Sequence, residues 1–142
     1  VVAPKFASFT TQHQMIGYLK KLQLLVLGCA AVFVLFSPLA SVAIPWFYGT
    51  AYASLPAIFY LYFSAMLIYL ISVPVHTAIF YYFSKPQVFI YVAIGQLTMI
   101  AFLGTYLTNR FGLVGLALAV VTGMVFNLVV PLFYVLMKLK GR

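Results

Sequence analysis

Long, predominantly apolar stretches of the sequence contain an imidazole or a side-chain amide at His76, Gln96 and Asn127. An ionisable or amide group in such surroundings needs a hydrogen-bonding partner, which another helix, water or a substrate can supply. Two interpretations of each residue stay open: a hydrogen-bonded packing residue, or a group that lines a polar cavity. Lys85 follows His76 along the chain and is a candidate contact for an anionic group at the cytoplasmic mouth of such a cavity.

Other chemistry is excluded by residue types that the chain lacks. It contains no Asp or Glu, so it has no side-chain carboxylate for general acid–base catalysis or for a hard metal ion. Its two histidines lie in separate regions, and its single cysteine, Cys29, lies in an apolar run. We interpret His13 as a solvated surface residue and Cys29 as a small hydrophobe. We therefore predict no catalytic residue, no metal site, no cofactor and no enzyme activity.

The composition indicates that the candidate residues lie in a membrane. The 142 residues are 66% hydrophobic, and the mean hydropathy is +1.16. Charged residues make up 6% of the chain, whereas an average soluble domain has about 25%. So small a polar surface cannot cover so large an apolar core in water. The net charge of +8 comes from cations scattered between apolar runs, which is typical of membrane topology and not of a nucleic-acid-binding face.

These cations divide the chain into candidate transmembrane helices. Residues 22–84 carry no charge, which suits two spans of about 20 residues each, and a cluster of Pro, Gly and aromatic residues marks the break. Two further uncharged stretches follow. Thr11 and Gln14 fit a capping box, so Thr11 is an expected N-cap. We predict one all-α transmembrane domain over 1–142, with an interfacial segment at 1–19, helices at about 20–45, 54–83, 87–108 and 112–138, and a tail at 139–142.

The distribution of the cations also orients the helices. If both chain ends are cytoplasmic, all eight cations except Arg110 fall on the cytoplasmic side. Because cytoplasmic loops are enriched in Lys and Arg, we predict this orientation, in a multi-pass protein of the cell membrane. Arg110 is interpreted as an interfacial anchor. The chain starts at Val1 without a signal-peptide pattern, so we expect it to be part of a longer membrane protein.

The last predicted helix carries small residues at every fourth position: Gly115, Ala119 and Gly123. Small side chains at this spacing allow a second helix to approach closely, which is how helices associate in lipid. We therefore predict that this row packs against another helix. Asn127 continues the row, and its amide would either bond that neighbouring helix or line a cavity.

The junctions between the predicted helices resemble those of bacterial and archaeal polysaccharide biosynthesis flippases. Residues 44–52 (IPWFYGTAY) are similar to the family's apolar pair–Phe–Gly–x–x–Tyr junction, and 84–86 (SKP) to its Gly-Lys/Arg-Pro turn. Residues 109–119 (NRFGLVGLALA) are similar to its basic–Phe–Gly–Ile/Val–x–Gly–Ala–Ala–x–Ala helix entry, and Pro4-Lys5 resembles the segment that enters this region. Ser84 stands where the family has glycine, and Leu116 where alanine is common.

This resemblance implies the C-terminal part of a flippase in the multidrug/oligosaccharidyl-lipid/polysaccharide exporter superfamily. It implies a MATE-like transporter of about 12–14 helices in two lobes that works by alternating access, with this chain supplying four helices of the second lobe. The implied substrate is a polyprenyl-diphosphate-linked oligosaccharide, flipped across the membrane for cell-surface polysaccharide biosynthesis. The implied partners are that glycan, membrane lipids and the N-terminal lobe of the same protein, and no nucleic acid. A cation-coupled multidrug exporter of the superfamily and a non-catalytic multi-pass assembly subunit are the alternatives.

Overall fold

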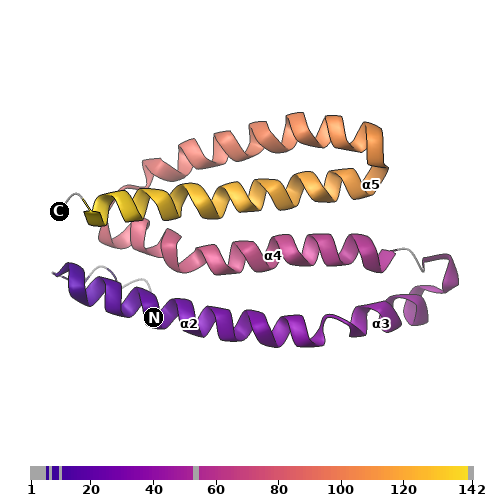
Figure 1. Ribbon diagram of the computed structural model, residues 1–142, viewed down its shortest axis with the longest axis horizontal. Coiled ribbons are helices and arrows are strands. Elements are labelled where there is room, and N and C mark those ends of the chain that lie inside the picture. Colours follow the sequence, from indigo (N-terminus) through magenta and orange to yellow (C-terminus); the bar gives the residue numbers. More distant parts are fainter. Residues whose placement is uncertain (1–5, 7, 10, 53–54, 141–142) are drawn as a thin grey trace.

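The computed structural model describes residues 6, 8–9, 11–52 and 55–140 and, within them, is helical without any strand. The long helices lie side by side along one axis, and Figure 1 shows their order as α2, α4, the second half of α5 and then its first half. The elements are α2 (Gln12–Phe36), α3 (Leu39–Tyr48), the 3₁₀ turn η1 (Thr50–Tyr52), α4 (Leu55–Thr77), the π-helical turn η2 (Ala78–Tyr82) and α5 (Gln87–Lys140).

α2 begins at Gln12, directly after the expected N-cap Thr11, and continues without a break into the stretch expected to span the membrane from about residue 20. The expected N-cap is confirmed, because the Thr11 side chain accepts a hydrogen bond from the backbone N–H of Gln14 at 3.4 Å. The first turns of the helix are held by packing: Met15 is fully buried in a cluster with Phe6 and with Ala78 of η2. The segment expected to be interfacial is therefore partly the start of a packed helix.

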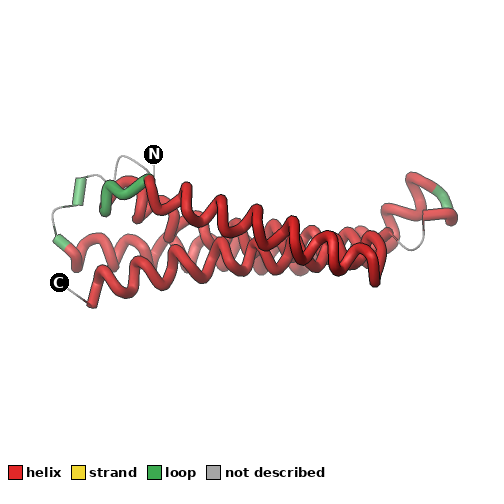
Figure 2. The backbone as a smooth tube through the Cα atoms, turned by 90° about the horizontal axis from the view of Figure 1, so that it is seen from above, coloured by secondary structure: helices red, strands yellow, loops and turns green. Residues whose placement is uncertain are grey.

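The first predicted helix, 20–45, is not continuous. α2 ends at Phe36, and α3 starts at Leu39 after Pro38. Proline has no N–H to continue the helical bonding, and the N–H of Ser37 bonds the carbonyl of Val34 in a tighter turn. α3 and η1 then project beyond the end of the long helices, as Figures 1 and 2 show from two directions.

α4 contains Pro74 and passes directly into η2, where the N–H of Phe83 bonds the carbonyl of Ala78 five residues back. Such π-helical turns are rare and often lie at functional sites. The chain then leaves the helix through Ser84, whose φ of 50° lies in the left-handed region. Glycine adopts this conformation without steric cost, whereas the Cβ atom of serine is strained in it.

Replacing Ser84 by glycine is therefore expected to stabilise the fold. A non-glycine residue in the left-handed region costs about 1–2 kcal/mol, so we expect Ser84→Gly to raise the free energy of unfolding by about 1 kcal/mol. Denaturant titration followed by far-ultraviolet circular dichroism in detergent measures this change. Ser64→Gly, in the regular helix α4, is the matched control and is expected to lower stability by a similar amount. Equal effects of the two substitutions would contradict the conformational explanation.

α5 reverses direction at Gly112, where φ is 59° and ψ is −140°, so its two halves pack against each other as antiparallel helices. Only glycine populates this combination of angles readily. The turn falls between the predicted helices 87–108 and 112–138. Arg110, from which the boundary between these two helices was predicted, lies two residues before this turn.

Many large apolar side chains of this fold are exposed, Leu35, Trp46 and Phe102 among them. Three helical stretches, Gln12–Phe36, Leu55–Tyr82 and Gln87–Lys140, are long and apolar enough to cross a membrane. A lipid bilayer or further membrane helices would cover such a surface. The chain is an all-α membrane protein, and the division into four spans, with α5 supplying two, stays a prediction.

Candidate functional site

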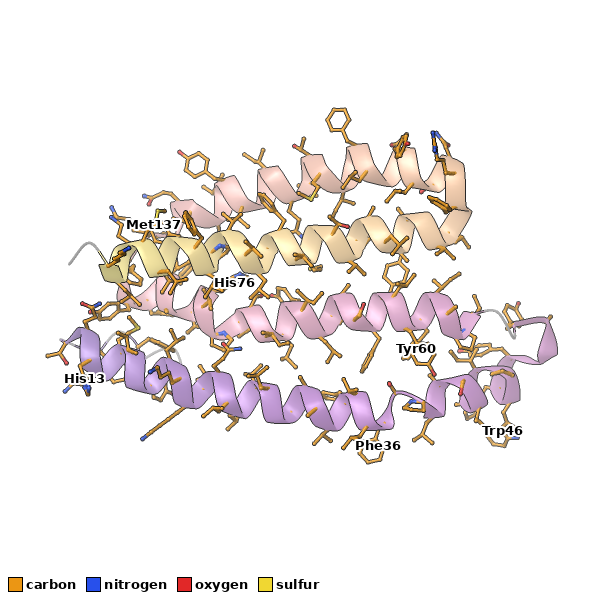
Figure 3. The ribbon with its side chains drawn as sticks, viewed as in Figure 1. His13, Phe36, Trp46, Tyr60, His76 and Met137 are labelled. Carbon is orange, nitrogen blue, oxygen red and sulfur yellow. The ribbon has the colours of Figure 1, made fainter. Side chains whose placement is uncertain are left out.

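The fold brings His76, Gln96 and Asn127 together into one polar cluster. The amide nitrogen of Asn127 donates to the side-chain oxygen of Gln96 at 2.6 Å, and Nε2 of His76 lies 3.1 Å from the backbone oxygen of Asn127. The three residues come from α4 and from both halves of α5, so the cluster ties three helical segments together. Figure 3 shows His76 where α4 faces the second half of α5.

The carbonyl that His76 contacts is available because of Pro131. In a regular helix the carbonyl of residue 127 accepts from the N–H of residue 131, and proline has no N–H. A bare carbonyl in a membrane is costly unless another donor reaches it. His76 supplies that donor from the neighbouring helix. Since a carbonyl only accepts, Nε2 of His76 carries a proton in this contact.

Aromatic rings hold the imidazole in place from two sides. The ring of Phe89, at the start of α5, meets His76 edge-on with centroids 5.1 Å apart, and Tyr69, two turns earlier in α4, does so at 6.3 Å. A side chain fixed in this way loses little further freedom when its hydrogen bond forms. The ring is therefore positioned by packing as well as by the Asn127 carbonyl.

Around Asn127 the cluster has more hydrogen-bond acceptors than donors. The side-chain oxygen Oδ1 of Asn127 is buried and has no hydrogen-bond partner among the described residues. The amide nitrogen of Gln96 points to the sulfur of Met124 at 3.6 Å, which is a weak acceptor. A donor from outside the described chain, such as a water or a hydroxyl group, would complete the network.

His76 also lines a pocket on the surface of the bundle. The cavity has a volume of 280 Å³, and its other walls are Thr77, Phe80, Tyr81 and Phe89. The wall residues belong to the end of α4, to η2 and to the start of α5. Aromatic walls with one polar group are typical of ligand pockets, although this one is slightly below the usual range of roughly 300–1,000 Å³.

Lys85 lies outside the cluster. It is exposed in the turn between η2 and α5, its backbone N–H bonds the carbonyl of Ile79 at 3.3 Å, and it does not line the pocket at His76. Its expected contact at a cavity mouth stays a prediction. Arg110, at the opposite end, stacks its guanidinium on the ring of Tyr106 at 4.9 Å, which suits an interfacial position.

The row of small residues, Gly115, Ala119 and Gly123, packs the second half of α5 closely against its first half. A Cβ added to Gly115 would overlap the carbonyl group of Leu107, and one added to Gly123 would lie 2.6 Å from two carbon atoms of Ile100. Ala119 is fully buried between them. Asn127 lies one turn beyond Gly123, so this close approach also sets the spacing at which its amide reaches the first half of α5.

Sequence reasoning missed a second pair of interhelical amide contacts. The side-chain nitrogen of Gln23 donates to the carbonyl of Ile71 at 3.2 Å, which joins α2 to α4, and that of Gln12 donates to the carbonyl of Leu139 at 3.1 Å. The signal for Gln23 was the same as for Gln96, an amide in an apolar run.

The remaining reactive side chains do not form a site within the described part of the chain. Cys29 is exposed on α2, His13 is exposed near the start of the same helix, and no three His or Cys side chains lie close enough to hold a metal ion. Comparisons with protein-family models, curated proteins and solved structures found no match to this chain. The cluster at His76 and the sequence are therefore the grounds for a functional proposal.

Proposed function

We propose that the chain is part of a membrane transporter that flips polyprenyl-diphosphate-linked oligosaccharide from the cytoplasmic to the outer leaflet by alternating access. The observation that carries the proposal is that the His76 side chain has two roles in the structure. It contacts the backbone of the neighbouring helix α5 and also lines an open pocket, although it lies in an uncharged and mostly apolar helix. Ionisable residues in membrane spans commonly mark the path of a polar substrate.

The residues of the pocket suit a sugar more than an ion. With Nε2 donating to the Asn127 carbonyl, Nδ1 of the neutral imidazole is an acceptor for a hydroxyl group. Phe80 and Phe89 provide apolar faces beside it. No side-chain carboxylate is present in the chain to bind a coupling cation, which favours the flippase over a cation-coupled exporter as far as this segment is concerned.

A scaffold role is the second candidate, and the short contact between Asn127 and Gln96 favours it. The 2.6 Å hydrogen bond joins the two amides without any substrate. In that case the cluster would hold α4 and the two halves of α5 together, and a partner lobe would supply the groups that bind the glycan. The two candidates differ in what alanine substitutions do to transport.

Alanine variants of His76, Gln96, Asn127 and Lys85 test the proposal. Loss of one neutral hydrogen bond, about 1 kcal/mol, is expected to lower transport several-fold, and Lys85→Ala to lower it more if the lysine meets the diphosphate. Export of lipid-linked glycan in cells, divided by the amount of the variant in the membrane, is the measurement. Gln12→Ala, which removes an interhelical bond at the end of the bundle, is the matched control and should export normally. Normal export by all four variants would assign the segment a scaffold role.

The proposed orientation, with both ends cytoplasmic, predicts which loops are accessible from outside. In a Cys29→Ala background, a cysteine at Asn109 is expected to react with an impermeant maleimide on intact cells, and a cysteine at Gln87 only after the cells are opened. Both positions are exposed and lie at opposite ends of the first half of α5. Labelling of Gln87→Cys on intact cells would reverse the orientation.

A further inference from the structure

A second cavity lies between α2, α4 and the second half of α5, away from the pocket at His76. Its volume is 360 Å³, within the range of roughly 300–1,000 Å³ that small-ligand pockets occupy. Apolar side chains form most of the wall, and the polar contribution comes from α2. The wall includes Lys20 and Gln23 of α2, Ile71 and Val75 of α4, and Leu128 and Leu132 of α5.

Lys20 is the only charged group that lines this cavity among the described residues, and the chain offers it no counter-ion. The side chain is exposed, and the sequence has no Asp or Glu with which to form an ion pair. The neighbouring amide of Gln23 is already engaged with the carbonyl of Ile71. The anion that balances Lys20 therefore comes from outside the chain's own side chains.

The cavity is aligned with the axis along which lipid chains would lie. Ile71 and Val75, and likewise Leu128 and Leu132, are each one turn apart, about 6 Å along their helices. Lys20 lies at the edge of the uncharged stretch 22–84, where a lysine reaches the headgroup layer while its stem stays on apolar surface. A headgroup at Lys20 would thus place the first part of an acyl chain against Val75 and Leu132.

We propose that this cavity binds one anionic phospholipid, with its phosphate at Lys20 and one acyl chain in the groove between α2, α4 and α5. Basic pockets between transmembrane helices bind anionic headgroups by the same combination of charge and apolar wall. The occupant is a resident membrane lipid and not the transported substrate. The inference therefore holds whether or not the chain belongs to a flippase.

Lipid retention by the purified chain in detergent tests the proposal. Native mass spectrometry compares bound phosphatidylglycerol with phosphatidylcholine of the same acyl chains. One lysine at an anionic headgroup is worth about fivefold in affinity, so we expect about a fivefold preference for phosphatidylglycerol. Lys20→Gln should remove this preference. Lys21→Gln is the matched control, because Lys21 carries the same charge but lines a different cavity, with His13 and Gln14.

Filling the groove provides the second arm of the test. Leu132→Trp, at a position that is 39% exposed, is expected to reduce retention of both lipids, and Leu128→Phe is a milder filler if the tryptophan disturbs helix content. Equal loss of the preference in Lys20→Gln and Lys21→Gln would show general surface attraction and overturn the site. Unchanged lipid retention in both Leu132→Trp and Leu128→Phe would also overturn the site. So would a dimer of the parent chain that these two substitutions dissociate, because a second copy of the chain would then occupy the groove.

Discussion

Gly115→Ala is expected to lower the free energy of unfolding by about 3 kcal/mol or more, because the added methyl group has no room. The Cβ atom would overlap the backbone carbonyl of Leu107 on the other half of α5. A backbone carbonyl cannot rotate away as a side chain can, so the two halves must separate near the Gly112 turn. The loss is measured by denaturant titration in detergent, followed by circular dichroism.

Two other glycines are the controls for this prediction. Gly123→Ala meets side-chain atoms of Ile100, one of them a terminal methyl group that can shift, so we expect a smaller loss of stability. Gly28→Ala meets nothing within 4 Å on α2 and is expected to be neutral or slightly stabilising. If Gly115→Ala were as stable as Gly28→Ala, the close approach of the two halves of α5 would be wrong.

His76→Ala is expected to have the second largest effect on stability, because it leaves the Asn127 carbonyl without a donor. Hydrogen bonds between transmembrane helices are usually worth about 0.6 kcal/mol and at most about 1.7 kcal/mol, since the polar group finds another partner when one is removed. Here Pro131 removes the helical alternative. We therefore expect the hydrogen bond to contribute about 1.5 kcal/mol, near the upper limit, in addition to the lost packing on Phe89.

A double-mutant cycle with Pro131→Ala separates the hydrogen bond from the packing. The introduced alanine has the N–H that proline lacks, so the carbonyl of Asn127 regains its partner within the helix. His76→Ala should then lower the free energy of unfolding by about 1.5 kcal/mol less in the Pro131→Ala background than in the parent. The loss of packing on Phe89 is the same in both backgrounds. If His76→Ala lowers the free energy of unfolding equally in both backgrounds, the histidine does not replace the N–H that Pro131 lacks.

The sequence predicts the helical class and the cluster residues because both leave strong local signals. Long apolar runs indicate spans, and amides or a histidine inside them must find partners. The sequence does not identify those partners. That His76 bonds the backbone of residue 127, and not a side chain, depends on Pro131 one turn further along and on the register between α4 and α5. A proline in a span is a local signal for a free carbonyl four residues earlier, but the helix that satisfies it is set by packing.

Two differences in the fold have similar causes. The break at Pro38 left a local signal in the sequence, because proline has no N–H to continue the helical hydrogen bonds, yet the uniform hydropathy of 22–44 concealed it. The packing of the first turns of α2, which were expected to be interfacial, depends on burial of Met15 against Phe6 and Ala78, and Ala78 is far away in sequence. By contrast, Ser84 and Gly112 mark turns that were recognisable, and their backbone angles explain why small residues stand there.

The most direct test of the proposed function is glycan export by His76→Ala in the parent and in the Pro131→Ala background. In the second background the Asn127 carbonyl is satisfied without the histidine, so any remaining loss of export cannot come from that carbonyl. If His76 contacts the transported glycan, export per unit of membrane protein stays several-fold below that of Pro131→Ala alone. If the double variant exports as well as Pro131→Ala does, His76 only holds the helices together, and its proposed contact with the substrate is contradicted.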